Sequence, residues 1–90
     1  MIYPYMTLED KTEVTHTEMK PDGTVTVYFE TPHAEDGFHS AVCVLPCYEW
    51  REVEGYSDEK MEELKEYIKN NAHLILTFSQ DGGILNAANF

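Results

Sequence analysis

The clearest pattern of hydrophobic and polar positions lies in two neighbouring stretches of the chain. Residues 12–19 (TEVTHTEM) and 24–31 (TVTVYFET) are rich in threonine, valine and aromatic residues, which favour β-strands. The KPDG sequence between them supplies a proline for the first turn position and a glycine for a positive φ. Val25, Val27 and Phe29 alternate with polar or aromatic neighbours, so these three side chains should face the core. The pattern predicts a β-hairpin with one buried face.

A third strand is predicted over residues 38–45 (FHSAVCVL). It follows residues 31–37 (TPHAEDG), whose proline, acidic residues and glycine are typical of a loop. The run from Ala41 to Leu45 is apolar on both faces, which indicates a strand inside the sheet. Pro46 ends it.

Two other segments have weaker patterns. Residues 3–8 (YPYMTL) predict a short extended segment, in which Pro4 suits an edge strand better than the centre of a sheet. Residues 47–55 (CYEWREVEG) fit either an extended edge strand or an irregular segment, and the pattern leaves both open.

A helix is predicted from about residue 58 to about residue 71. Ser57 is a good N-cap, and Asp58 and Glu59 lie at the positive end of the helix dipole. Apolar residues with helical spacing form a narrow stripe for packing on the sheet: Met61, Leu64, Ile68 and Ala72. The short apolar run that follows, residues 72–79 (AHLILTFS), predicts another buried strand, closed by the turn QDGG.

These elements predict a single α+β domain over residues 1–90. Its sheet is antiparallel or mixed and has about four to five strands, with one helix packed across it. The expected order is β-β-β-α-β, with an extra N-terminal strand as an option.

Composition and charge narrow the classes of function. A hydrophobic content of 42% is enough for a folded core in a chain of 90 residues. Seventeen acidic and six basic residues give a net charge of −11, which repels phosphate backbones and argues against direct nucleic-acid binding. The same charge favours a basic protein partner, or a role as an acidic mimic that inhibits a nucleic-acid-binding protein.

The sequence has no basic leader, no signal-peptide run and no apolar stretch of membrane-spanning length. We therefore expect a cytoplasmic protein that does not bind a membrane. The two cysteines, Cys43 and Cys47, are expected to remain free thiols.

Four side chains are of types that bind zinc, namely His33, His39, Cys43 and Cys47. Their spacing, H-x5-H-x3-C-x3-C, lacks the close pair that usually starts a zinc site. On one strand, His39 and Cys43 would lie about 13 to 14 Å apart, too far to bind one ion. The alternative hypothesis is a small metal-binding or thiol-reactive protein that uses His39, Cys43 and Cys47. Under the leading hypothesis, no cofactor is expected.

Catalysis has no positive signal in this sequence. It contains no P-loop, no dinucleotide fingerprint, no G-x-S-x-G and no H-E-x-x-H motif. We therefore expect a protein that is not an enzyme. A hydrolase or isomerase that uses His39 or His73 requires a carboxylate in hydrogen-bond contact with that histidine, inside a pocket.

The leading functional hypothesis is a non-enzymatic interaction module. Tyr48, Trp50 and Tyr56 would anchor a protein partner, because aromatic residues are enriched at the centres of interfaces. Acidic residues around them would steer a basic partner: Glu52, Glu54, Glu59 and Glu63. In the competing interpretation, Trp50 and Tyr56 close the core beneath the helix. A homodimer through the same surface or a sheet edge is also compatible with so small a core.

Two further observations concern the later part of the chain. Residues 84–90, from Ile84 to Phe90, are expected either to dock on the sheet or to form a displayed apolar tail. With its LPCYEW, NAHLILTFS and GGILNAANF strings, the chain resembles short acidic bacterial proteins of unknown function. None of these strings is a functional motif, so the resemblance implies no site and no activity.

Overall fold

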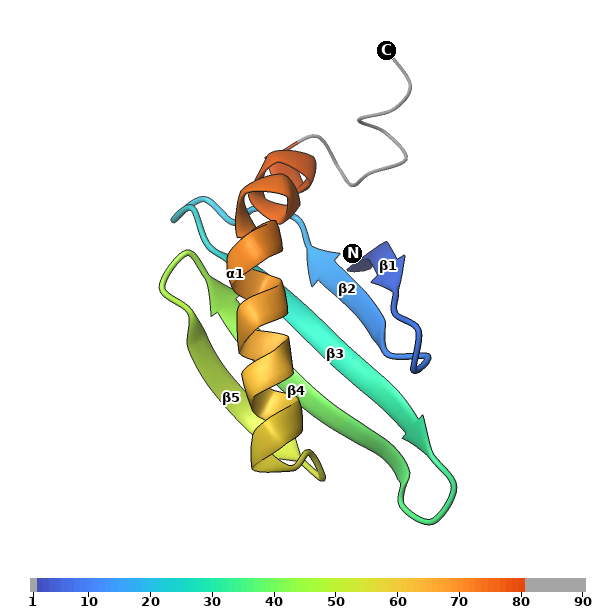
Figure 1. Cartoon of the computed structure of the whole chain (residues 1–90). Coiled ribbons are helices and arrows are strands. Elements are labelled where there is room, and N and C mark those ends of the chain that lie inside the picture. The colour runs from blue at the N-terminus through green and yellow to red at the C-terminus, as the bar shows by residue number, and fades with distance from the viewer. Residues whose placement is uncertain (1, 81–90) are drawn as a thin grey trace.

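The computed structural model of the chain describes residues 2–80. Five strands precede one helix: β1 (Ile2–Thr7), β2 (Glu13–Thr17), β3 (Val25–His33), β4 (Gly37–Leu45), β5 (Glu49–Glu54) and α1 (Asp58–Gln80). Each strand pairs antiparallel with the next, so the sheet order equals the chain order. α1 lies across one face of this sheet (Figure 1). The predicted α+β class, with one helix packed across a small sheet, is confirmed.

The predicted hairpin is formed by β2 and β3. At its turn the Gly23 N–H donates to the Lys20 carbonyl over 2.8 Å, and Gly23 has a φ of 85°. A side chain at this φ is strained, which explains the glycine. Val25, Val27 and Phe29 are all fully buried, as their alternation predicts.

β4 lies inside the sheet, between β3 and β5, as its apolar run predicts. β3 and β4 are joined by nine paired positions, from Val25 opposite Leu45 to His33 opposite Gly37. The segment left open between a strand and an irregular region is a strand, β5, and it forms one edge of the sheet. The N-terminal segment is also a strand, β1, and forms the other edge.

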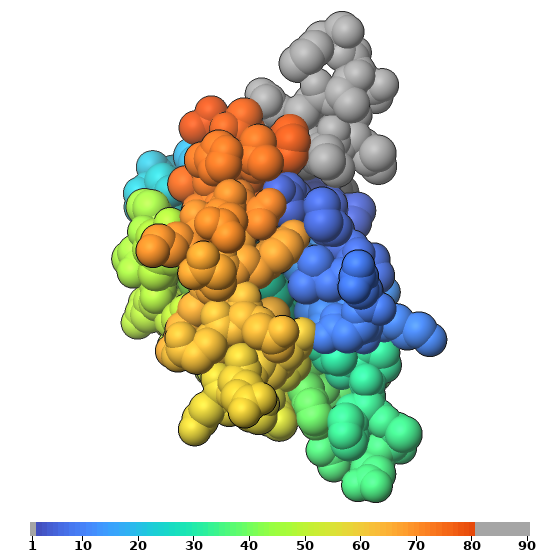
Figure 2. All heavy atoms as spheres, in the orientation of Figure 1, coloured from blue at the N-terminus to red at the C-terminus, as the bar shows by residue number. Residues whose placement is uncertain are grey.

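α1 begins at the predicted cap, because Ser57 Oγ accepts the Lys60 N–H over 3.1 Å. Its buried positions repeat every three or four residues and face the sheet: Leu64, Ile68, Ala72, Ile75 and Ser79. Figure 2 shows α1 as a continuous ridge, with the blue N-terminal part of the chain on one side of it and the yellow-green β4–β5 turn on the other.

The predicted strand over residues 72–79 is wrong, because α1 continues through this segment to Gln80. No glycine or proline interrupts the chain from residue 58 to residue 80, so nothing forces the helix to stop. Ala72, Ile75 and Ser79 extend the buried stripe at helical spacing, whereas Leu74 is 39% exposed. An apolar run of this length is compatible with either element, and contact with the sheet favours the helix.

Polar contacts also hold α1 to the β1–β2 side of the sheet. The Tyr5 hydroxyl donates to Asn71 Oδ1 over 2.8 Å, and Lys60 forms an ion pair with Asp10. Hydrogen bonds from Lys60 and from buried Thr12 lower the pKa of Asp10 to about 2. Asp10 therefore stays ionised until strongly acidic pH. Its ion pair with Lys60, which joins the β1–β2 loop to α1, persists over the same pH range.

No helix within residues 2–80 has the length and apolar character needed to cross a membrane. The two expectations for residues 84–90, docked or displayed, concern residues outside the described part of the chain.

Candidate functional site

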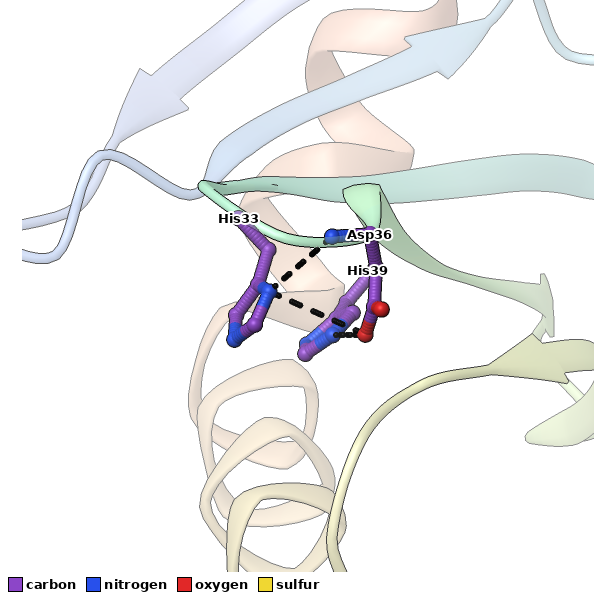
Figure 3. Close-up of side chains that lie close together, drawn as sticks. All are labelled: His33, Asp36 and His39. Atoms are coloured by element: carbon purple, nitrogen blue, oxygen red, sulfur yellow. Dashed lines mark hydrogen bonds and ion pairs between the residues drawn. The ribbon is translucent and has the colours of Figure 1, made fainter.

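Three side chains with metal-binding atoms meet where β3 turns into β4. His33 is the last residue of β3, Asp36 lies in the turn, and His39 is the third residue of β4. Figure 3 shows the two imidazole rings and the carboxylate on the same side of this turn. The pairing of His33 with Gly37 closes the hairpin and brings the three residues together.

The donor atoms of this triad are close to a metal-binding arrangement. His39 Nε2 lies 2.9 Å and His33 Nδ1 lies 3.7 Å from the same oxygen of Asp36, Oδ2. One donor atom from each residue falls within 4.8 Å of the other two. Zinc binds such atoms at roughly 2.0 to 2.2 Å, so tetrahedral ligands lie about 3.3 Å from one another. Small side-chain movements would therefore place all three around one ion.

The side chains of the triad also hold one another in place without a metal. The hydrogen bond from His39 lowers the pKa of Asp36, which keeps this carboxylate ionised. His33 Nδ1 accepts the backbone N–H groups of Glu35 and Asp36, each at 3.3 Å. These two bonds to His33 are long and weak, whereas an ion bound through His39 Nε2 would also displace its 2.9 Å hydrogen bond to Asp36. The His33 and His39 rings stack with their centroids 4.3 Å apart.

His39 is positioned by the segment between β5 and α1. Its side chain is only 16% exposed, and its ring packs edge-on against Tyr56 with centroids 5.8 Å apart. The Tyr56 hydroxyl is in turn hydrogen-bonded to Thr31 Oγ1 at 2.8 Å. Gly55 leaves the space that the imidazole occupies, because a Cβ there would lie 2.2 Å from His39 Cδ2. His39 is therefore preorganised, whereas His33 and Asp36 face solvent.

The structure separates the four predicted zinc ligands. Within the described part of the chain, the group of metal donors contains His33 and His39 but neither cysteine. Cys43 is fully buried, and burial raises the pKa of its thiol to about 12. Cys47 is exposed beyond the other end of β4, with its sulfur 3.4 Å from the Val44 carbonyl oxygen. Both cysteines are free thiols, as expected.

Sequence reasoning missed Asp36. Its signal was present as H-x2-D-x2-H across a loop between two strands, a spacing that a tight hairpin can fold into one cluster. The zinc-ligand pattern considered only histidines and cysteines, so it did not include this carboxylate. The separation of His39 from Cys43 along one strand was argued correctly, since the two thiols stay apart from the triad.

A hydrolase or isomerase that uses a histidine would need a carboxylate hydrogen-bonded to it, inside a pocket. The first of these two requirements is met. His39 and Asp36 are in hydrogen-bond contact, but the cavity of about 210 Å³ that His39 lines does not include Asp36 in its lining. His73 lies on the exposed side of α1. The arrangement therefore favours ion binding over acid–base chemistry in a pocket.

The predicted interaction residues differ in their exposure. Tyr48 is 45% exposed. Trp50 is half-buried and stacks on Phe29 with ring centroids 5.6 Å apart, and Tyr56 is half-buried against the core. The four acidic residues are exposed: Glu52, Glu54, Glu59 and Glu63. Of the three aromatic residues, Tyr48 is the one displayed to solvent.

Comparison of the chain with protein-family models, with curated proteins and with solved structures found no match. The resemblance to short acidic bacterial proteins stays a prediction.

Proposed function

We propose that this protein binds one divalent transition-metal ion through His33, Asp36 and His39. The observation that carries this proposal is the convergence of three donor atoms within 4.8 Å on a single turn. Imidazole nitrogen and carboxylate oxygen together suit zinc, nickel, copper and iron better than magnesium or calcium, which prefer oxygen ligands alone. Zinc is the first candidate because three such ligands are common in its open sites.

The triad would leave part of the coordination shell open. His33 and Asp36 have side chains that are 42% and 59% exposed, so water or a donor atom from a second molecule can reach the ion. His39, with a side chain only 16% exposed, would supply the fixed ligand, and the other two would close on the metal. A site of this kind binds more weakly than a structural zinc site with four protein ligands.

The test is calorimetric titration of zinc into protein that was purified without a metal-affinity tag. We expect one site per chain, and His39→Gln should weaken it by at least about tenfold. His73→Gln is the matched control, since this exposed histidine lies on α1 and should not change the affinity. Tetrahedral visible absorption of a cobalt complex would report the ligand geometry. Equal affinities of the His39 variant and the native chain would exclude the site.

A second candidate function, binding of a basic protein partner, is supported by the exposure of β5. This edge strand carries three exposed acidic residues, Glu49, Glu52 and Glu54. Exposed Tyr48 and Val53 add apolar contact area, at 45% and 43% exposure. Carboxylates would steer the partner, and the outer edge of β5, which pairs with no strand among residues 2–80, would contribute hydrogen bonds.

This second candidate is tested by changing Glu49, Glu52 and Glu54 together to glutamine. We expect the variant to lose the basic proteins that the native chain captures at low salt, because the steering charges are gone. The control changes three exposed acidic residues near the opposite edge and on α1: Glu9, Glu13 and Glu66. Equal loss in both variants would mean that net charge alone causes capture. Gel filtration at several concentrations would reveal self-association through β5.

A further inference from the structure

An open groove lies between α1 and the β4–β5 turn, at the opposite end of β4 from the histidine triad. It is lined by Tyr48, Trp50, Lys65, Ile68 and Lys69, and its volume is about 470 Å³. Small-molecule sites have volumes of roughly 300 to 1,000 Å³ and combine an apolar lining with a few polar groups. The groove has both properties.

The floor of this groove is apolar and held by the core. Trp50 lies opposite Cys43 in the sheet and stacks on Phe29, which is fully buried. Ile68 is 1% exposed and belongs to the buried stripe of α1. An indole supported in this way offers a flat surface, and a ring stacked on it would lose little freedom.

Tyr48 forms one side of the groove in an unusual backbone conformation. Its φ is 56°, in the left-handed region that non-glycine residues rarely adopt. The turn nevertheless displays this large side chain, which is 45% exposed. Strained residues of this kind persist where the surrounding structure determines them, and they cluster at ligand sites.

The charge of the groove is opposite to that of the protein. Lys65 and Lys69 lie one helical turn apart, and they are two of only six basic residues in a chain of net charge −11. The Lys65 ammonium lies 3.8 Å from Glu62 in an exposed pair, which is a weak contact. For Lys69 the structure records no ion pair among residues 2–80. Two lysine side chains therefore line a groove with an aromatic floor.

We propose that this groove binds a small organic anion that carries a flat aromatic ring. The ring stacks between Tyr48 and Trp50, and the carboxylate or phosphate lies between the Lys65 and Lys69 ammonium groups. Lysine ammonium groups recognise such an anion as point charges. The surrounding acidic surface repels polyanions, so a small ligand fits the electrostatics better than a nucleic acid. This site is separate from the metal triad and does not depend on it.

The test uses the indole N–H of Trp50, which gives a single NMR cross-peak because the chain has one tryptophan. The probes are naphthoate and its neutral isostere naphthamide. We expect naphthoate to shift the cross-peak saturably and to bind at least about fivefold more tightly than naphthamide. Changing Lys65 and Lys69 together to glutamine should abolish this preference.

The matched control changes Lys11 and Lys20 to glutamine, which alters the net charge equally at two exposed positions. It should keep the preference for naphthoate. Equal binding of the two probes by the native chain would overturn the proposal, as would an equal loss in both double variants. The variant with both Lys65 and Lys69 changed should bind zinc with the same affinity as the native chain. The test of the anion groove is therefore independent of whether the triad binds a metal.

Discussion

Phe29→Ala should remove about 3 to 5 kcal/mol from the free energy of unfolding. Phe29 is fully buried in β3, stacks on Trp50 and contacts the Tyr67 ring edge-on at a centroid distance of 6.3 Å. Its loss would leave a cavity between the sheet and α1 and remove the support beneath the groove. A domain of this length has roughly 5 to 13 kcal/mol of stability, so the change consumes a large share of it. Urea unfolding followed by circular dichroism measures the effect.

The matched control for this prediction is Phe38→Ala. It deletes the same atoms from a side chain that is 62% exposed on β4, and we expect a change of no more than about 0.5 kcal/mol. A small effect of the Phe29 change, comparable to that of Phe38, would contradict a core centred on Phe29 between the sheet and α1.

Gly55→Ala should reduce stability by about 2 to 3 kcal/mol and also weaken metal binding by at least about tenfold. Gly55 has a φ of 88°, which strains any other residue. Its new Cβ would lie 2.2 Å from the imidazole of His39, so the ring would have to turn away from Asp36. Thermal unfolding and zinc titration of the same sample separate the two effects.

Gly23→Ala provides the matched control for this second prediction. Its φ of 85° imposes the same backbone strain, but no atom of the described residues lies within 4 Å of the new Cβ. We expect a loss of about 1 kcal/mol with unchanged zinc affinity. If both glycine variants bound zinc as the native chain does, Gly55 would have no role in positioning His39.

The proposed metal triad and the proposed anion groove lie at opposite ends of one strand, β4. His39 lies near the start of β4, whereas Tyr48 follows its end, and Cys43 is buried between them. The apolar middle of β4 belongs to the core between the sheet and α1, and the residues of the two proposed sites lie at the turns. Chemistry that the sequence places within one stretch of residues is thus divided between two surfaces.

Local signals predicted much of the fold. Gly23 and the proline before it specify the β2–β3 turn, and Ser57 specifies the start of α1, because each acts on backbone groups a few residues away. The end of α1 has no comparable local signal. Residues 72–79 are apolar enough for a strand, and the choice of a helix depends on burial against the sheet.

The sequence by itself determined the alternating hairpin, the interior strand and the amphipathic start of the helix, since these follow from residue period and turn chemistry. The tertiary structure alone decided the length of α1, the exposure of Tyr48 relative to Trp50, and the contact of Gly55 with His39. Each of these depends on atoms that are distant in the chain. Side-chain patterns specify which face of an element is apolar, but only packing decides which neighbour covers that face and which side chains it leaves free to bind a ligand.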